Sequence, residues 1–236
     1  MTIDDAAVAD LDPFGIYDAE AERLDRFFTG LSERERDRPS RAAGWSVRDV
    51  LAHLAGEELY NHACLDDELA RLTDMLTQEG VSGLGGFNDW CVRERRALPY
   101  DEVLAEWRRK NAETRRRMRE LGRNATLQTL AGPYPVGAQT FHYCSELATH
   151  ADDVGAPVAA GEAGGRTEWR VKVALYVLAE QHAKAQVKPS AEQIWVYADG
   201  AEAQLSPPEF VEATVGRLPD DHPLDPRIRS ALRCLA

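Results

Sequence analysis

Long apolar runs are missing from this sequence. No stretch approaches the roughly 18 consecutive apolar residues that a membrane-spanning helix requires. The first residues, Met1 to Asp12, are acidic and contain neither the basic region nor the apolar region of a secretory signal. We therefore expect a protein without a membrane partner, located in the cytoplasm.

Cysteine is scarce and scattered. The chain has 4 cysteines, with no C-x-x-C pair among them, which fits reduced thiols better than a disulfide framework. We expect each cysteine to be reduced and to serve as a small core residue. They are Cys64, Cys91, Cys144 and Cys234.

Positive charge is also in short supply. The sequence has 28 Lys and Arg residues against 40 Asp and Glu residues, a formal net charge of −12. Nucleic-acid binding depends on clustered positive charge, so we expect no nucleic acid as a partner. A basic run from Arg108 to Arg119 has Glu113 within it, which is typical of a solvated helix face.

Helical periodicity is the dominant pattern in the rest of the chain. Apolar residues recur at helical spacing in several long segments separated by proline or glycine, so we predict an all-α fold. The start of one helix is well marked, because Ser46 and Asp49 have the spacing of a capping box. The expected helices cover about 16–38, 47–76, 87–98, 101–121, 139–155 and 168–186.

The C-terminal segment has a different composition. It contains the short apolar run Ile194 to Tyr197 and then several prolines, and its forty-odd residues are too few to form a sizeable core of their own. We predict a helical domain over residues 1–190 and a small appendage, residues 191–236, packed on that domain.

Two residues four positions apart form the candidate site. Glu146 and His150 would lie on the same face of the helix predicted over 139–155, where both could contact one ion. His53, on an earlier helix, is the candidate third ligand. Two histidines and one carboxylate leave a coordination position free, as catalytic zinc sites do.

This spacing also occurs by chance on solvated helices, so it is not decisive alone. Of the other four histidines, His62 and His142 have no matching partner on a shared inward strip of their helices. His182 lies late in the last predicted bundle helix, and His222 lies in a proline-rich loop. We expect these four to be structural or exposed.

Two motifs resemble one known family. The stretch Gly44 to Ala55, which reads GWSVRDVLAHLA, resembles the metal-binding helix of the DinB-like superfamily in its mycothiol-dependent maleylpyruvate isomerase branch. The stretch Tyr134 to Pro157, which contains Glu146, His150 and Asp153, is similar to the second metal helix of that branch. The resemblance covers residues 10–190, with the motifs in the expected order.

This resemblance implies both a fold and a chemistry. The fold is a DinB-like four-helix bundle, in which His53, Glu146 and His150 hold a divalent ion, usually zinc. The ion binds a low-molecular-weight thiol, which the family suggests is mycothiol. The thiolate then reacts with a small electrophile, either by S-transfer or by cis/trans isomerisation.

Two further residues are assigned roles at this site. Asp153 follows His150 by three positions and could orient its imidazole as a hydrogen-bond acceptor. Tyr134 precedes the helix and is placed at the substrate mouth. Both are our candidate catalytic residues.

Three alternatives remain open at this stage. The same three ligands could activate water for hydrolysis, with Glu57 or Asp153 as the general base. They could hold iron(II) for oxygen chemistry. The protein could instead bind a metal or small molecule without catalysis. The isomerase has a larger C-terminal domain than the appendage expected here, so the substrate is left open, as is the choice between monomer and homodimer.

Overall fold

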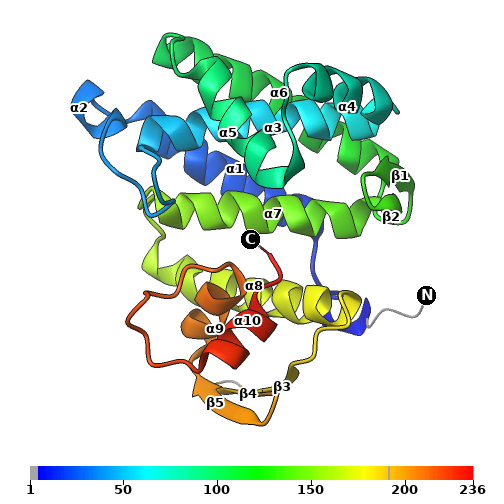
Figure 1. Ribbon diagram of the computed structural model, residues 1–236, viewed down its shortest axis with the longest axis vertical. Helices are drawn as coiled ribbons and strands as arrows, with labels where there is room; N and C mark the ends of the chain where they lie inside the picture. The colour runs from blue at the N-terminus through cyan, green and yellow to red at the C-terminus, as the bar shows by residue number, and fades with distance from the viewer. Residues whose placement is uncertain (1–4, 191, 236) are drawn as a thin grey trace. The chain divides into compact units, whose positions relative to one another are not determined.

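The computed structural model describes residues 5–190 and 192–235 (Figure 1). The chain is mostly helical, but it also contains a two-stranded and a three-stranded antiparallel sheet, so the prediction of an all-α fold is corrected. By its contacts, the chain divides into two compact units. The first is Pro13–Pro157, and the second is Val158–Ala236 together with the N-terminal segment that ends at Asp12.

The first unit is built from helices and one hairpin. In it, α3 packs against α6 and α5, and α1 packs against α7 and α6. In chain order the elements are α1 (Pro13–Thr29), α2 (Glu33–Arg36), α3 (Val47–Leu65), α4 (Leu69–Gln78), α5 (Gly83–Arg95), α6 (Tyr100–Leu121), β1 (Thr126–Thr129), β2 (Gly132–Pro135) and α7 (Val136–Asp153).

The core of this unit consists of the apolar faces that the helical periodicity predicts. Phe28 of α1 and Trp107 of α6 are buried and meet edge to face, with their ring centroids 5.9 Å apart. Leu51 and Leu54 of α3 and Phe141 of α7 are also buried. Burial of such side chains contributes most of the stability of packed helices.

The start of α3 is fixed by the predicted capping box. The Asp49 amide donates to Ser46 Oγ at 3.2 Å, and the Ser46 amide donates to Asp49 Oδ2 at 3.0 Å. Both bonds satisfy backbone N–H groups that have no partner within the helix. The first helical residue is therefore Val47, and this defines the face on which His53 lies.

A glycine allows α3 and α5 to approach closely. A Cβ atom on Gly56 would lie 2.3 Å from Cys91 Cβ and 2.8 Å from a guanidinium nitrogen of Arg95. Any larger residue would push the two helices apart. Cys91 is buried in this contact, and all four cysteines are free thiols, as the sequence analysis predicts.

The hairpin β1–β2 leads directly into α7. The strands pair from Thr126 with Pro135 to Thr129 with Gly132, and α7 begins at the next residue, Val136. The helix therefore starts three residues earlier than predicted. Pro133 and Pro135 favour an irregular turn in the sequence. In the structure Pro133 lies on β2 of the two-stranded sheet and Pro135 is the N-cap of α7, and neither position needs a backbone N–H group.

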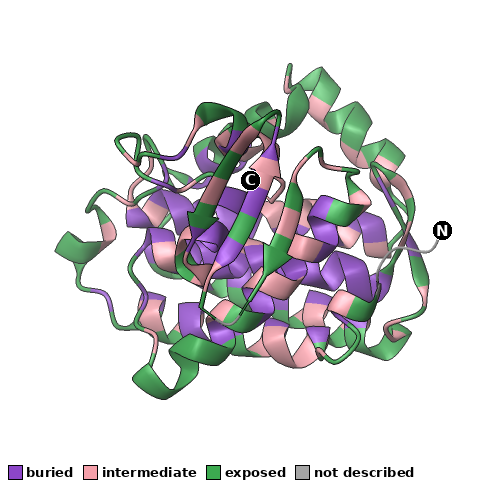
Figure 2. Ribbon diagram, turned by 90° about the horizontal axis from the view of Figure 1, so that it is seen from below, coloured by how far each residue is buried: buried purple, intermediate pink, exposed green. Residues whose placement is uncertain are grey.

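The second unit has its own sheet and its own core. Strands β3 (Gln186–Pro189), β4 (Ile194–Ala198) and β5 (Ala201–Leu205) form an antiparallel sheet in this order. Residues along β4 alternate between buried and more exposed, as Figure 2 shows by colour. The helices of this unit are η1 (Asp5–Ala7), α8 (Ala160–Glu180), α9 (Pro207–Thr214) and α10 (Pro226–Leu232).

Helix α8 belongs to this second unit by its contacts. Its residues Ala174 and Leu178 share a buried cluster with Val196 of β4, Phe210 of α9 and Ile228 of α10. The sequence analysis expected this helix to pack in the bundle and the segment after residue 190 to have no sizeable core. The predicted domain division at residue 190 stays a prediction, whereas the contacts divide the chain after Pro157.

No helix within the described residues is both long enough and apolar enough to cross a membrane.

Candidate metal centre

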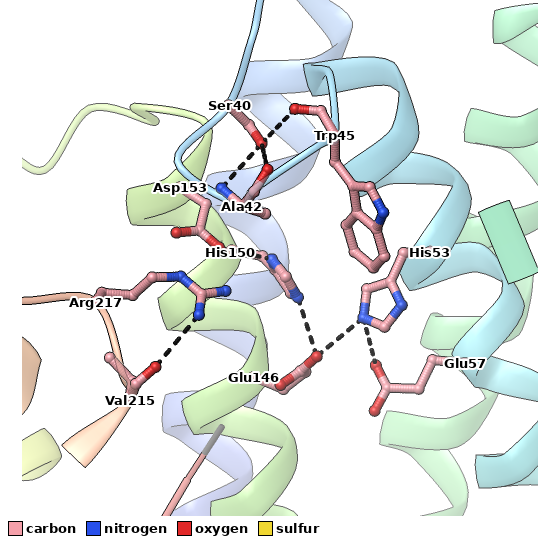
Figure 3. Close-up of polar contacts among 10 residues, drawn as sticks. All are labelled: Ser40, Ala42, Trp45, His53, Glu57, Glu146, His150, Asp153, Val215 and Arg217. Atoms are coloured by element: carbon pink, nitrogen blue, oxygen red, sulfur yellow. Dashed lines mark hydrogen bonds and ion pairs between the residues drawn. The ribbon is translucent and has the colours of Figure 1, made fainter. Parts of the chain in front are cut away.

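Three side chains from two helices converge in the first unit. His53 of α3 and both Glu146 and His150 of α7 each place one possible ligand atom within 4.8 Å of the others. Glu146 Oε1 lies 2.9 Å from His53 Nε2 and 3.0 Å from His150 Nε2 (Figure 3). One carboxylate oxygen therefore bridges two imidazoles, and the structure brings together the three residues predicted from the sequence.

Local structure explains this convergence. Glu146 and His150 are four residues apart on α7, so they lie on one face. His53 lies six residues into α3 from the capped start, and its ring centroid is 4.8 Å from that of His150. We call His53, Glu146 and His150 the triad.

The burial of the triad is uneven. The side chains of His53 and His150 are 2% and 6% exposed, whereas that of Glu146 is 29% exposed. The imidazoles are thus sheltered from water, while the carboxylate borders solvent. A ligand reaching the triad from outside would arrive on the Glu146 side.

The donor set fits a divalent ion such as zinc. Zinc binds imidazole nitrogen and carboxylate oxygen, and three protein ligands with one free position are typical of catalytic sites. Nδ1 of His53 is buried and has no hydrogen-bond partner among the described residues. Nδ1 of His150 is also buried, and it lies in ion-pair contact with Asp153 Oδ2, at 3.1 Å.

The charges of the triad depend on one another. Burial raises the pKa of a carboxyl group, but His150 and His53 outweigh this effect and hold the pKa of Glu146 well below its usual value. Burial lowers the pKa of an imidazole, but Glu146 and Asp153 outweigh it and raise the pKa of His150 to about 10. For His53, burial dominates and lowers the pKa.

Asp153 lies next to the His150 imidazole, the neighbour that the sequence analysis expected for it. Its side chain is fully buried next to His150, and its backbone carbonyl accepts a hydrogen bond from the Arg41 amide at 2.9 Å. This contact joins the last turn of α7 to the segment before α3. Its role as a partner that orients His150 stays a prediction.

Two residues of the α3 region also surround the triad. The Trp45 ring lies 4.9 Å from the His53 ring and 6.2 Å from the His150 ring, centroid to centroid. It covers both imidazoles on one side. Glu57 is one turn after His53, with its Oε2 atom 4.0 Å from His53 Nε2. Burial and the Glu146 carboxylate raise the pKa of Glu57 well above its usual value.

Tyr134 lies on β2 and contacts a histidine that the sequence analysis set aside. Its hydroxyl is 3.1 Å from His142 Nε2. His142 is four residues before Glu146, so His142, Glu146 and His150 follow one another at the same spacing on α7. This regular spacing was the signal that could have identified His142 as part of the polar strip.

The fold and the triad define a mostly helical protein with a candidate three-ligand metal centre. Residues 17–155 match the family model described as the mycothiol maleylpyruvate isomerase N-terminal domain. The match covers more than half of the chain, which therefore belongs to this family, and the resemblance drawn from the two motifs is confirmed.

Two solved structures are similar to the chain. They are the crystal structure of the mycothiol-dependent maleylpyruvate isomerase and that of a histidine-to-alanine mutant of it. Each is 15% identical, has a TM-score of 0.51, and is matched over 71% of this chain and 67% of the other. At this identity the likeness shows the fold alone. Among curated proteins, none matches.

Proposed function

We propose that the chain is a divalent-metal-dependent thiol enzyme, with zinc as the metal and mycothiol as the thiol cosubstrate. The observation that carries the proposal is the convergence of two imidazole nitrogens on one Glu146 oxygen. Membership of the family supports the choice of mycothiol. The reaction is S-transfer to, or cis/trans isomerisation of, a small electrophilic molecule.

In this proposal His53, Glu146 and His150 hold the ion. A bound divalent ion supplies a positive charge that favours the thiolate form of a thiol, which is the nucleophilic form. The partial exposure of Glu146 gives the thiol access, while Trp45 and the burial of both imidazoles exclude water from the other side.

The remaining candidate residues have supporting roles. Asp153 holds the proton on His150 Nδ1, so that Nε2 offers its lone pair to the ion. Tyr134, on β2, contacts His142, which lies one turn before Glu146 on α7, and in this proposal it borders the entry to the site. We further infer that α1, α3, α6 and α7 form the DinB-like four-helix bundle, and that the protein acts in the cytoplasm.

A hydrolase is the second candidate function. Glu57, with its carboxylate 4.0 Å from His53 Nε2, has the position of a general base for an attacking water. The two functions differ in their need for a thiol. A protein that only binds a metal or small molecule would show neither activity.

The test combines metal analysis with a thiol-swap assay. Protein purified without chelator is expected to contain stoichiometric metal, and His53→Ala to lose it. The matched control is His182→Ala, an exposed histidine of the second unit. A panel of electrophiles is then assayed with mycothiol, with N-acetylcysteine and without thiol. Turnover without thiol would favour the hydrolase, and absence of metal in the wild type would refute the proposal.

A further inference from the structure

The solvent-facing side of α7 is narrow. Within this helix every residue is buried except His142, Glu146 and Asp152. His142 and Glu146 are one turn apart, so they form a single strip that extends from the triad towards the start of the helix. Four residues correspond to about 6 Å along a helix axis. His142 is thus the first partly exposed α7 side chain that a molecule extending from the triad in this direction would meet.

His142 is paired with a tyrosine from the hairpin. Tyr134 and His142 are joined by the 3.1 Å contact between the hydroxyl and Nε2, and both side chains are half-buried. The register of β1 and β2 places Tyr134 opposite Leu127, which is itself buried. The pair is therefore held in place by the hairpin and the helix together, and it offers hydroxyl and imidazole groups that donate and accept hydrogen bonds.

Acidic groups flank the path from the pair to the triad. Glu146 separates His142 from His150 on α7, and Glu57 follows His53 on α3. Both carboxylates are partly exposed. A ligand segment carrying negative charge would be repelled by the Glu146 carboxylate, whereas neutral hydroxyl and amide groups could hydrogen-bond to both side chains.

We propose that Tyr134 and His142 bind the hydroxyl-bearing part of the thiol cosubstrate while its sulfur lies at the triad. This inference rests on the proposed function. Mycothiol carries its thiol on a cysteinyl group that is joined to a sugar and an inositol, both neutral and rich in hydroxyl groups. The cysteinyl linker spans the single helical turn between Glu146 and His142, and the sugar hydroxyls meet the tyrosine–histidine pair.

The test measures thiol binding directly. The protein is loaded with Co²⁺, and the absorption band of a thiolate bound to cobalt is followed during titration with mycothiol or with N-acetylcysteine, which lacks the sugars. Tyr134→Phe and His142→Phe are each expected to weaken mycothiol binding by roughly three- to tenfold, the effect of losing one neutral hydrogen bond. Neither variant should change the affinity for N-acetylcysteine or the cobalt content.

Matched variants keep the outcomes distinct. Tyr197→Phe, on β4 of the second unit, removes a hydroxyl elsewhere and should leave both affinities unchanged. Unchanged mycothiol affinity in both Tyr134→Phe and His142→Phe would overturn the inference, and so would equal weakening of the binding of the two thiols. A cobalt-loaded wild type that binds neither thiol would instead refute the proposed function itself.

Discussion

Glu146 Oε1 and His53 Nε2 are 2.9 Å apart, although 93 positions separate the two residues in the chain. The same oxygen lies 3.0 Å from His150 Nε2. A single carboxylate oxygen thus links α3 to α7 and brings two buried imidazoles towards one point. The predictions about metal binding all depend on this link.

Replacing Glu146 tests the link directly. Glu146→Gln keeps the size of the side chain but removes the negative charge, and a neutral amide is a poor ligand for zinc. We expect metal affinity to fall by more than about 100-fold, since loss of a residue that only supports a ligand already costs 10- to 100-fold. Competition with a chromophoric chelator measures the affinity. The control Glu120→Gln, exposed on α6 and paired with Arg116, should bind metal as the wild type does.

Metal binding should release a proton. The pKa of His150 is raised to about 10, while that of His53 is lowered and that of Glu146 lies well below its usual value. At pH 7 to 8 the metal-free triad therefore holds its proton on His150, and the incoming ion must displace it. Calorimetry in buffers with different ionisation enthalpies should count about one proton per ion.

The same proton sets the pH dependence of affinity. Between pH 7 and 9, the apparent affinity for the metal ion should rise by about tenfold per pH unit. One proton leaves His150 for each ion that binds, so each tenfold drop in proton concentration raises this affinity about tenfold. The rise should level off as the pH passes about 10, where His150 loses its proton without metal. An affinity that does not change over this range would contradict the protonated state of His150.

Asp153 should matter to metal binding without contacting the metal. Asp153→Asn keeps the shape of the side chain but replaces a charged acceptor 3.1 Å from His150 Nδ1 with a neutral amide. We expect a 10- to 100-fold loss of metal affinity, typical of residues that orient a ligand histidine. The pKa of His150 should also fall, and NMR titration of the metal-free protein can follow it. Asp74→Asn, on the exposed face of α4, serves as the control.

Gly56 should be required for stability and not for chemistry. In Gly56→Ala the new methyl group would lie 2.3 Å from Cys91 Cβ, so α3 and α5 must move apart. We expect a loss of about 1–3 kcal/mol in the free energy of unfolding, measured with urea. Gly85→Ala, in α5 with no atom within 4 Å of the new methyl group, should be neutral or stabilising. Equal losses in the two variants would contradict the packing explanation.

The helices near the site could be predicted well from local patterns. Ser46 and Asp49 identify the start of α3, and the four-residue spacing of Glu146 and His150 places them on one face of α7. These signals act over one or two turns, so the sequence reports them directly. The approach of His53 to the other two depends on how the helices pack, which local patterns do not report. The residue types offered His53 as a candidate third ligand, and the family resemblance supported it.

Other parts were missed for identifiable reasons. The turn Asp199-Gly200 has positive φ at both residues and joins β4 to β5, a typical hairpin signal that followed the apolar run at Ile194. The sequence analysis relied on the apolar run, the prolines and the length of the segment, and it predicted no strands there. Helix α8 was predicted as a helix, but an apolar face does not reveal which core it will join. His142 was set aside because only inward-facing partners were considered.

Trp45 gives the triad an optical readout of its own. Its indole lies over both imidazoles, at 4.9 Å from His53 and 6.2 Å from His150, and a protonated imidazole quenches indole fluorescence at such distances. Because the proton on His150 and a bound zinc ion exclude each other, the emission of this one tryptophan among 5 should rise when zinc displaces the proton. The residue that shelters the site from water thus also reports which ion or proton the site contains.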